Sequence, residues 1–218
     1  MVAPILYLVA FGLGLGRNIT VDSGNYIDFL VPGILALNSM NISFNSIMPI
    51  HAERVYHKSL EEYILAPISP IAFVIGKILA AVLRSLISSS LIILLAFIFG
   101  AKLNLSALFI VILILNSIIF AGLGFIAAMK INTYEEMAQV NTYILLPMSF
   151  LCGTFFKTST LPEVVKFFIE LLPLTHTSYL LRSLGNNLEI SLTSLMIIIA
   201  YAALIFYLAN LSFKQQLR

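Results

Sequence analysis

Long apolar runs separated by short polar connections make up most of this chain of 218 residues. A helix of about 20 apolar residues is long enough to cross the hydrocarbon core of a bilayer. Hydrophobic residues make up 60% of the sequence, whereas soluble domains contain about 45–50%. We therefore predict an all-α, polytopic (multi-pass) membrane protein, in which residues 1–218 form a single transmembrane domain.

Six transmembrane helices are predicted from these runs. The first run holds only fifteen residues, so this helix is expected to be truncated and the complete protein to start upstream of Met1. The second run is expected to be interrupted at Pro32-Gly33 and the fifth to be kinked or broken at Pro147, because proline removes a helical hydrogen bond. The six runs are residues 2–16, 26–48, 71–100, 105–129, 138–156 and 192–211.

Two further segments lie between the fifth and sixth runs. Residues 162–172 carry Glu163, Lys166 and Glu170 on one helical stripe, with apolar residues around the rest. A segment of this length cannot span a bilayer but can lie in its interface, so we predict a short extracellular interfacial helix. Residues 173–191 are expected to form a loop.

The stretch from His51 to Pro70 is the most polar part of a chain in which only 10% of the residues are charged. Unpaired charge in the bilayer core is costly, so this polar segment must lie in water or against another protein. Seven Lys and Arg residues fall on its side of the membrane and five on the other, which places it in the cytoplasm. The seven are Arg54, Lys58, Lys77, Arg84, Lys130, Lys214 and Arg218, and the five are Arg17, Lys102, Lys157, Lys166 and Arg182.

Three stretches carry patterns that bear on function. They are Tyr26-Ile-Asp-Phe-Leu-Val-Pro-Gly33; Ser59-Leu60-Glu61-Glu62 with Ala66-Pro67 and Gly76-Lys77; and Phe150-Leu-Cys-Gly-Thr-Phe-Phe156 with Leu161-Pro162, Pro173-Leu-Thr-His176 and Arg182. In this order, with these spans between them, they resemble the type-2 permease (transmembrane subunit) family of ABC exporters of drugs, glycolipids and polysaccharides. Lys58 stands where that family has Gly, Lys157 where it often has Pro, and His176 where it has Tyr.

The resemblance implies a six-span subunit of the cell inner (plasma) membrane that works as a homo- or heterodimer with two separate ATP-binding ABC subunits. The polar segment would then hold a cytoplasmic coupling helix, from about Glu53 to Leu65, and the segments after the fifth span would form an extracellular lid. The chain has no GxxxxGK[ST] phosphate loop, so ATP and Mg are expected in the partner subunit and no cofactor in this chain. The expected coupling residues are Glu53, Arg54, Lys58, Leu60, Glu61 and Glu62, and the expected lid residues are Gly153, Pro162, Pro173 and His176.

Three groups of polar residues have more than one interpretation. Asn38, Asn41 and Asn45 share one helical stripe of the second run and predict either polar contacts between helices or a wall of the translocation path. The polar segment is either a docking surface or a solvated loop. His51 and His57 lack the spacing that places two ligands on one helix face, so no metal site is expected.

The predicted function is that of a permease subunit of an ATP-driven exporter for a lipid, a glycolipid or polysaccharide, or a hydrophobic drug-like substrate. The chain itself is not expected to be an enzyme. An ion-gradient-driven secondary transporter would need an ionisable residue in mid-membrane, and a polytopic membrane enzyme would need a metal- or phosphate-handling cluster. The net charge of +2 is spread along the chain without a basic face, so membrane lipid and protein are the expected partners and nucleic acid is not.

Overall fold

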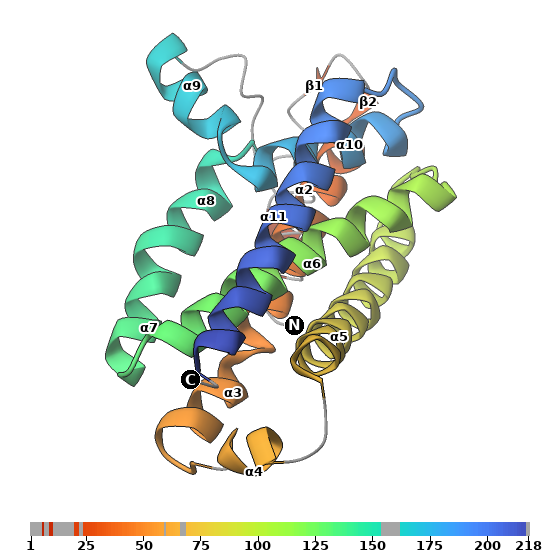
Figure 1. Ribbon diagram of the computed structural model, residues 1–218. Coiled ribbons are helices and arrows are strands. Elements are labelled where there is room, and N and C mark those ends of the chain that lie inside the picture. The colour runs from red at the N-terminus through yellow and green to blue at the C-terminus, as the bar shows by residue number, and fades with distance from the viewer. Residues whose placement is uncertain are drawn as a thin grey trace.

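In the part of the chain that the structure describes, a bundle of helices is accompanied by one short strand pair at residues 20–21 and 24–25 (Figure 1). The computed structural model describes residues 6, 9–10, 20–21, 24–58, 60–65, 69–153 and 162–216. Strands β1 (Thr20–Val21) and β2 (Gly24–Asn25) pair in antiparallel fashion. The helices are α2 (Tyr26–Asn45), α3 (Met48–Val55), α4 (Leu60–Leu65), α5 (Pro70–Ile98), α6 (Ala107–Lys130), α7 (Tyr134–Val140), the π-helix η2 (Asn141–Leu145), α8 (Leu146–Leu151), α9 (Glu163–Glu170), α10 (Pro173–Gly185) and α11 (Leu192–Gln216).

Four helices of the described ranges are long and apolar enough to cross a membrane, namely α2 continued by α3, α5, α6 and α11. The pair α9–α10 is bent by 90° and would make a fifth if it counts as one span. The predicted fifth run corresponds to α7, η2 and α8 in series. The all-α polytopic fold is therefore confirmed, whereas the predicted first span lies outside the described residues except at positions 6, 9 and 10.

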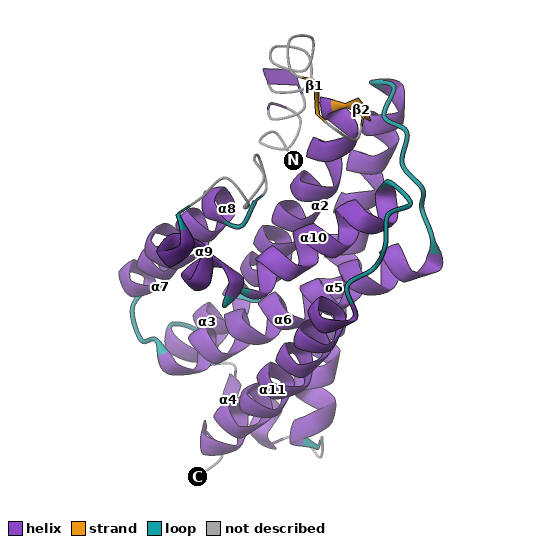
Figure 2. Cartoon of the chain, turned by 90° about the horizontal axis from the view of Figure 1, so that it is seen from above, coloured by secondary structure: helices purple, strands orange, loops and turns teal. Residues whose placement is uncertain are grey.

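The bundle has two distinct ends. Figures 1 and 2 place β1 and β2 at one end of α2, and α4 with the end of α11 at the opposite end. Between these ends α6 packs against α2, α5, α10 and α11. Two glycines make these contacts close: a Cβ added at Gly124 would lie 2.8 Å from the carbonyl oxygen of Phe44 in α2, and one at Gly122 would lie 2.6 Å from Cγ2 of Ile205 in α11. Small residues at these points let the helix backbones approach one another.

Three helices are capped at their N-termini by a hydroxyl side chain. Ser69, Ser106 and Thr133 accept hydrogen bonds of 3.2–3.3 Å from the backbone N–H three residues later, at the starts of α5, α6 and α7. Such caps satisfy a donor that has no partner within the helix. Pro70 follows its cap as the first residue of α5, where a missing N–H costs nothing.

The two prolines expected to disturb helices behave differently. The predicted interruption at Pro32 is wrong, because α2 continues through it. Gly185 of α10 lies against it, and a Cβ there would come within 3.5 Å of the Pro32 ring; membrane helices tolerate proline where neighbouring helices pack against it. No break occurs at Pro147, because the chain is helical from Tyr134 to Leu151. The helix changes form instead: the π-helix η2 directly precedes α8, in whose first turn Pro147 lies.

Residues 173–185 form α10, so the loop predicted for residues 173–191 is wrong over most of its length. Most of this helix is buried, but its sequence lacks an apolar periodicity because short polar side chains occupy several of the buried positions. Their hydroxyls donate to carbonyl oxygens: Thr177 to Pro173 at 3.1 Å, Ser178 to Thr175 at 3.0 Å and Thr175 to Ile169 at 2.6 Å. Because these bonds satisfy the hydroxyl groups, the polar side chains can be buried in a helix.

Candidate coupling surface and outer lid

The polar segment forms two short helices, α3 and α4, instead of the single coupling helix predicted from Glu53 to Leu65. The chain turns between them at Lys58, whose φ of 53° lies in the left-handed region. A side chain makes that conformation unfavourable, and glycine adopts it freely. The glycine of the permease motif that Lys58 replaces therefore corresponds to a conformational requirement of this turn.

Lys77 of α5 attaches this surface to the third predicted span. Its ammonium group forms an ion pair with Glu53 of α3 at 3.3 Å. The same nitrogen lies 5.1 Å from the ring centroid of Tyr63 in α4 and 5.3 Å from that of Phe73 in α5, within the range of a cation–π interaction. One side chain of α5 thus holds both short helices.

Arg54 of α3 attaches the surface to the end of α6. Its guanidinium group donates to the carbonyl oxygens of Met129 and Ile131 and, at 3.0 Å, to the side chain of Asn132. Gln216 at the end of α11 donates to the Met129 oxygen as well, at 2.9 Å. The last carbonyls of a helix lack partners within it and carry partial negative charge, so a cation is favourable there.

Several side chains of α3, α4 and the turn between them are exposed. Leu60 is buried and anchors α4 in the bundle. Among the described side chains from Tyr56 to Tyr63, the exposed ones are Tyr56, His57, Lys58, Glu62 and Tyr63, and Tyr63 also lies against Lys77. They combine aromatic rings with both signs of charge, a composition suited to a protein partner.

At the opposite end, α9 and α10 meet at an angle of 90°, and α10 packs into the bundle against α2, α6 and α11. We call this pair the outer cover, because the sequence predicts that it is extracellular. His176 of α10 joins three helices: its Nε2 lies 2.8 Å from the carbonyl oxygen of Glu170 in α9, and its Nδ1 lies 3.2 Å from Oγ of Ser194 in α11. Since a carbonyl can only accept, Nε2 donates, and in the neutral ring Nδ1 accepts from the Ser194 hydroxyl. Gly153, with a φ of 71°, turns the chain out of α8. A cavity of about 310 Å³ lies between these elements.

A second contact ties α10 to α2. Arg182 donates from Nε to the carbonyl oxygen of Phe29 at 3.0 Å, and its guanidinium carbon lies 3.8 Å from the centroid of the Phe29 ring. The hydrogen bond and the cation–π attraction both hold the partly buried Arg182 side chain against α2. The outer cover is therefore fixed both to α2 and to α11.

A buried polar network crosses the middle of the bundle. Asn116 of α6 donates to Ser39 Oγ at 2.6 Å and to the Ala36 carbonyl at 3.2 Å, both in α2, and accepts from Thr177 of α10 at 2.9 Å. Asn38 of α2 donates to Ser88 of α5 at 2.8 Å. Such bonds between helices stabilise membrane proteins modestly and fix their register.

The comparisons with known proteins decide the family. The family model described as ABC-2 type transporter matches residues 1–185. This chain belongs to the ABC-2 type transporter family. Nodulation protein J of Bradyrhizobium diazoefficiens is 28% identical over 222 residues, covering 98% of this chain and 84% of that protein, and its namesake in Rhizobium meliloti is 26% identical over 219 residues with the same coverage. The inner membrane transport permease YadH of Escherichia coli strain K12 is 23% identical over 164 residues, or 74% of this chain and 64% of YadH.

Membership confirms the resemblance predicted from the three motif stretches. The protein is an ABC-2 permease, a multi-pass transport protein of the inner membrane. Family membership also implies an ATP-binding ABC partner. Among the described residues, no group of three His, Cys, Asp or Glu side chains is arranged to hold a metal ion.

The structure places the predicted residues of the permease in different settings. Docking by Glu53 and Arg54 stays a prediction, and each has a partner within the chain. Lys58 and Glu62 are exposed, and the side chain of Glu61 lies outside the described ones. Pro162 is the N-cap of α9 and Pro173 the first residue of α10.

The three asparagines of the second predicted run differ in how deeply they are buried. Asn38 is buried in the contact with α5, as one of the two interpretations expected. Asn41 is half-buried and Asn45 exposed, and Asn45 accepts a hydrogen bond from Asn141 of η2 at 3.1 Å. A role of this stripe in translocation stays a prediction.

Sequence reasoning missed Asn116 and Thr177. Asn116 is the one amide or charged side chain between Ala107 and Met129, and that isolation in an apolar run was the available signal. Thr177 gave no such signal, because its segment was interpreted as a loop.

Proposed function

We propose that this ABC-2 permease is the transmembrane subunit of an ATP-driven exporter, with residues 1–218 acting as a single transmembrane domain. A separate ATP-binding subunit, which would hold ATP and Mg, docks on α3 and α4. The observation that carries the proposal is the double attachment of this surface, through Lys77 to α5 and through Arg54 to the end of α6.

The attachments give the surface a mechanical role. A push on α3 and α4 moves Glu53 and Arg54, and each of these is bonded to a different long helix, Glu53 to α5 and Arg54 to α6. Hydrogen bonds with a charged partner are stronger than neutral ones, so the bonded groups move together. A partner that closes on ATP thereby displaces α5 and α6.

The proposed substrate class is supported by the polar groups beside α2. A cavity of about 420 Å³ between α2 and α5 is lined by Ile42, Asn45, Ser46, Arg84, Ile87 and Ser88. Its walls combine one cation and amide and hydroxyl groups with aliphatic side chains. Such a mixture suits an amphipathic molecule, so a lipid or glycolipid fits better than a purely apolar drug.

The outer cover acts as the lid of this pathway in the proposal. Its contacts through His176 and Arg182 hold α10 against α11 and α2, so export requires these contacts to rearrange. We infer a homo- or heterodimer of such subunits, as the resemblance to exporter permeases implies.

The test is a charge reversal on the proposed docking surface. Glu61→Lys combined with Glu62→Lys is expected to reduce co-purification with the ATP-binding subunit by more than about tenfold, because like charges at an interface cost several kcal/mol. Glu189→Lys is the control, since Glu189 is exposed in the loop before α11. ATP hydrolysis and transport are measured in the same preparations. Unchanged assembly and transport in the double reversal, or equal loss in the control, would contradict the proposed surface.

A further inference from the structure

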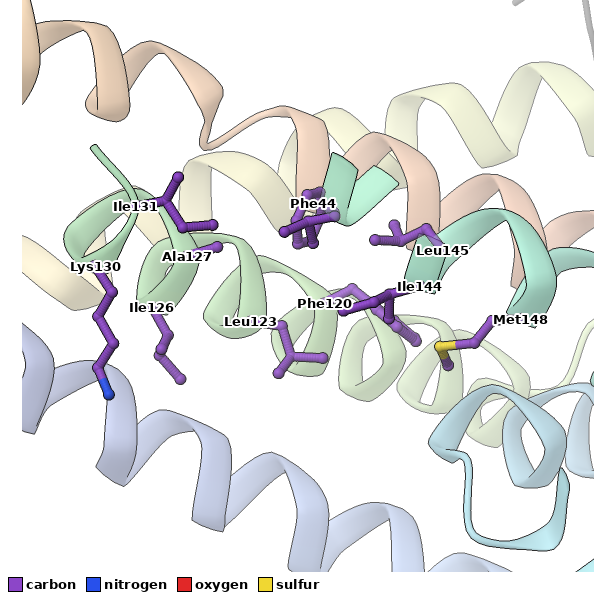
Figure 3. A pocket seen from close by; sticks show the side chains of 11 residues that line it. Phe44, Phe120, Leu123, Ile126, Ala127, Lys130, Ile131, Ile144, Leu145 and Met148 are labelled. Atoms are coloured by element: carbon purple, nitrogen blue, oxygen red, sulfur yellow. The ribbon is translucent and has the colours of Figure 1, made fainter. Parts of the chain in front are cut away.

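An apolar groove of about 300 Å³ runs along α6 beside η2 and α8. Phe44 of α2 and Phe120 of α6 are buried in it, and Leu145 and Met148 line it from the other side. Figure 3 shows the lining side chains as a row, with Lys130 at one end and Met148 at the other. Lys130 is the one charged residue of this lining.

The length of the groove matches one leaflet of a bilayer. From Phe120 to Lys130 it follows ten residues of α6, or about 15 Å of helix. The hydrocarbon core of a bilayer is about 30 Å thick, so half of it is about 15 Å. Since Lys130 is the last residue of this apolar helix, the groove begins at the membrane surface and ends near the midplane.

The positive charge of Lys130 at the open end of the groove favours a negatively charged ligand. Lys130 is exposed, and no side chain of the described ranges forms an ion pair or hydrogen bond with its ammonium group. It lies next to Ile131, whose carbonyl oxygen binds Arg54 of the polar segment. A lysine at this position extends its charge to the headgroup layer while its methylene groups stay in the apolar region. Anionic headgroups are attracted to such a cation.

We propose that this groove binds an anionic phospholipid of the cytoplasmic leaflet, with one acyl chain against α6 and the phosphate at Lys130. The lipid is a bound component of the permease and is distinct from its exported cargo. It fills the space between α6 and the η2–α8 segment, so its presence sets the position of that segment. The permease therefore senses the charge of its own leaflet at the helix end that Arg54 also holds.

The test measures lipid retention by the full-length permease in complex with its ATP-binding partner. The complex is placed in nanodiscs with equal amounts of phosphatidylglycerol and phosphatidylcholine, extracted in mild detergent, and the retained lipids are counted by native mass spectrometry. Lys130→Gln is expected to lower the retained ratio of phosphatidylglycerol to phosphatidylcholine about fivefold, the effect of one lysine at an anionic surface. Lys130→Arg keeps the ratio. The control Lys102→Gln, in the exposed loop before α6, keeps it as well.

A second variant tests the apolar part of the site. Ala127 lines the groove, and Ala127→Phe is expected to remove the retained lipid of both headgroups. Equal phosphatidylglycerol retention in wild type and Lys130→Gln would overturn the proposal. So would a disulfide between two copies of Leu123→Cys in a Cys152→Ser background, because a second permease would then cover the groove. Retention is measured without transport, so failure here is separable from failure of the proposed exporter function.

Discussion

Gly124→Ala tests how much the close packing of α2 against α6 contributes to the stability of the protein. The added Cβ would lie 2.8 Å from the Phe44 carbonyl oxygen and 3.3 Å from its Cα, both backbone atoms. Ordinary contact begins at 3.4 Å, so the helices must separate by about 0.6 Å at this point. Overpacking of this kind typically costs about 1–3 kcal/mol. A gain of about 1 kcal/mol in helix propensity offsets part of it, and net destabilisation by up to about 2 kcal/mol is expected.

Two other glycines make a matched series with the same chemical change. Gly76 of α5 has no atom within 4 Å of the position that a Cβ would take, so Gly76→Ala is expected to stabilise the protein by about 0.5–1 kcal/mol. Gly122→Ala is intermediate, because the nearest atom, at 2.6 Å, belongs to the side chain of Ile205 and can shift more easily than backbone. The expected order of stability is Gly76→Ala, wild type, Gly122→Ala and Gly124→Ala.

The single cysteine supplies the assay. Cys152 is fully buried, so the rate at which a thiol-reactive dye labels it in mixed SDS micelles reports how often the bundle opens. The Gly124→Ala variant should label fastest and Gly76→Ala slowest. Equal labelling rates for these two variants would refute the reasoning, since the close approach of α2 and α6 would then have no energetic consequence.

Two further predictions concern the outer half of the bundle. Thr177→Val leaves Asn116 Oδ1 without its buried donor and should destabilise the protein by about 1–2 kcal/mol in the same Cys152 assay. Thr193→Val, at an exposed hydroxyl, is the control and should change the stability little. Equal effects of the two variants would contradict a stabilising role of the buried polar network. Glu163→Cys in a Cys152→Ser background should react with an impermeant thiol reagent added outside intact cells, because α9 is predicted to be extracellular; labelling from the cytoplasmic side alone would overturn the topology.

Periodicity and proline chemistry predicted much of the fold, for identifiable reasons. The apolar runs predicted α2, α5, α6 and α11, and the π-helix before Pro147 fits the missing N–H of proline. The helix α10 was missed because Thr175, Thr177 and Ser178 look like loop residues until their acceptors are known. A hydroxyl that bonds a carbonyl one turn earlier is compatible with a buried helix, and no local pattern distinguishes the two cases.

The candidate site was less predictable than the fold. The charges of Glu53 and Arg54 marked the polar segment, but the partners of Arg54 are backbone carbonyls of Met129 and Ile131. Every residue has a carbonyl group, so such partners leave no trace in the sequence. The turn at Lys58 was equally hidden, because a lysine with positive φ is uncommon and only the glycine of the family motif indicated it.

In the proposed coupling mechanism, the connections of α6 would carry a push from one end of the permease to the other. Arg54 holds its last carbonyls, and Asn116, fourteen residues or about 21 Å along the same helix, bonds α2 and α10 at once. A helix is stiff along its axis, so a displacement at Arg54 arrives at Asn116 with little loss. At Asn116 the moving α6 must either stretch the hydrogen bonds to Ser39 and Thr177 or carry their helices, α2 and α10, along. Because a buried amide left without partners is costly, carrying them along is the lower-energy response, and α10 moves with α6.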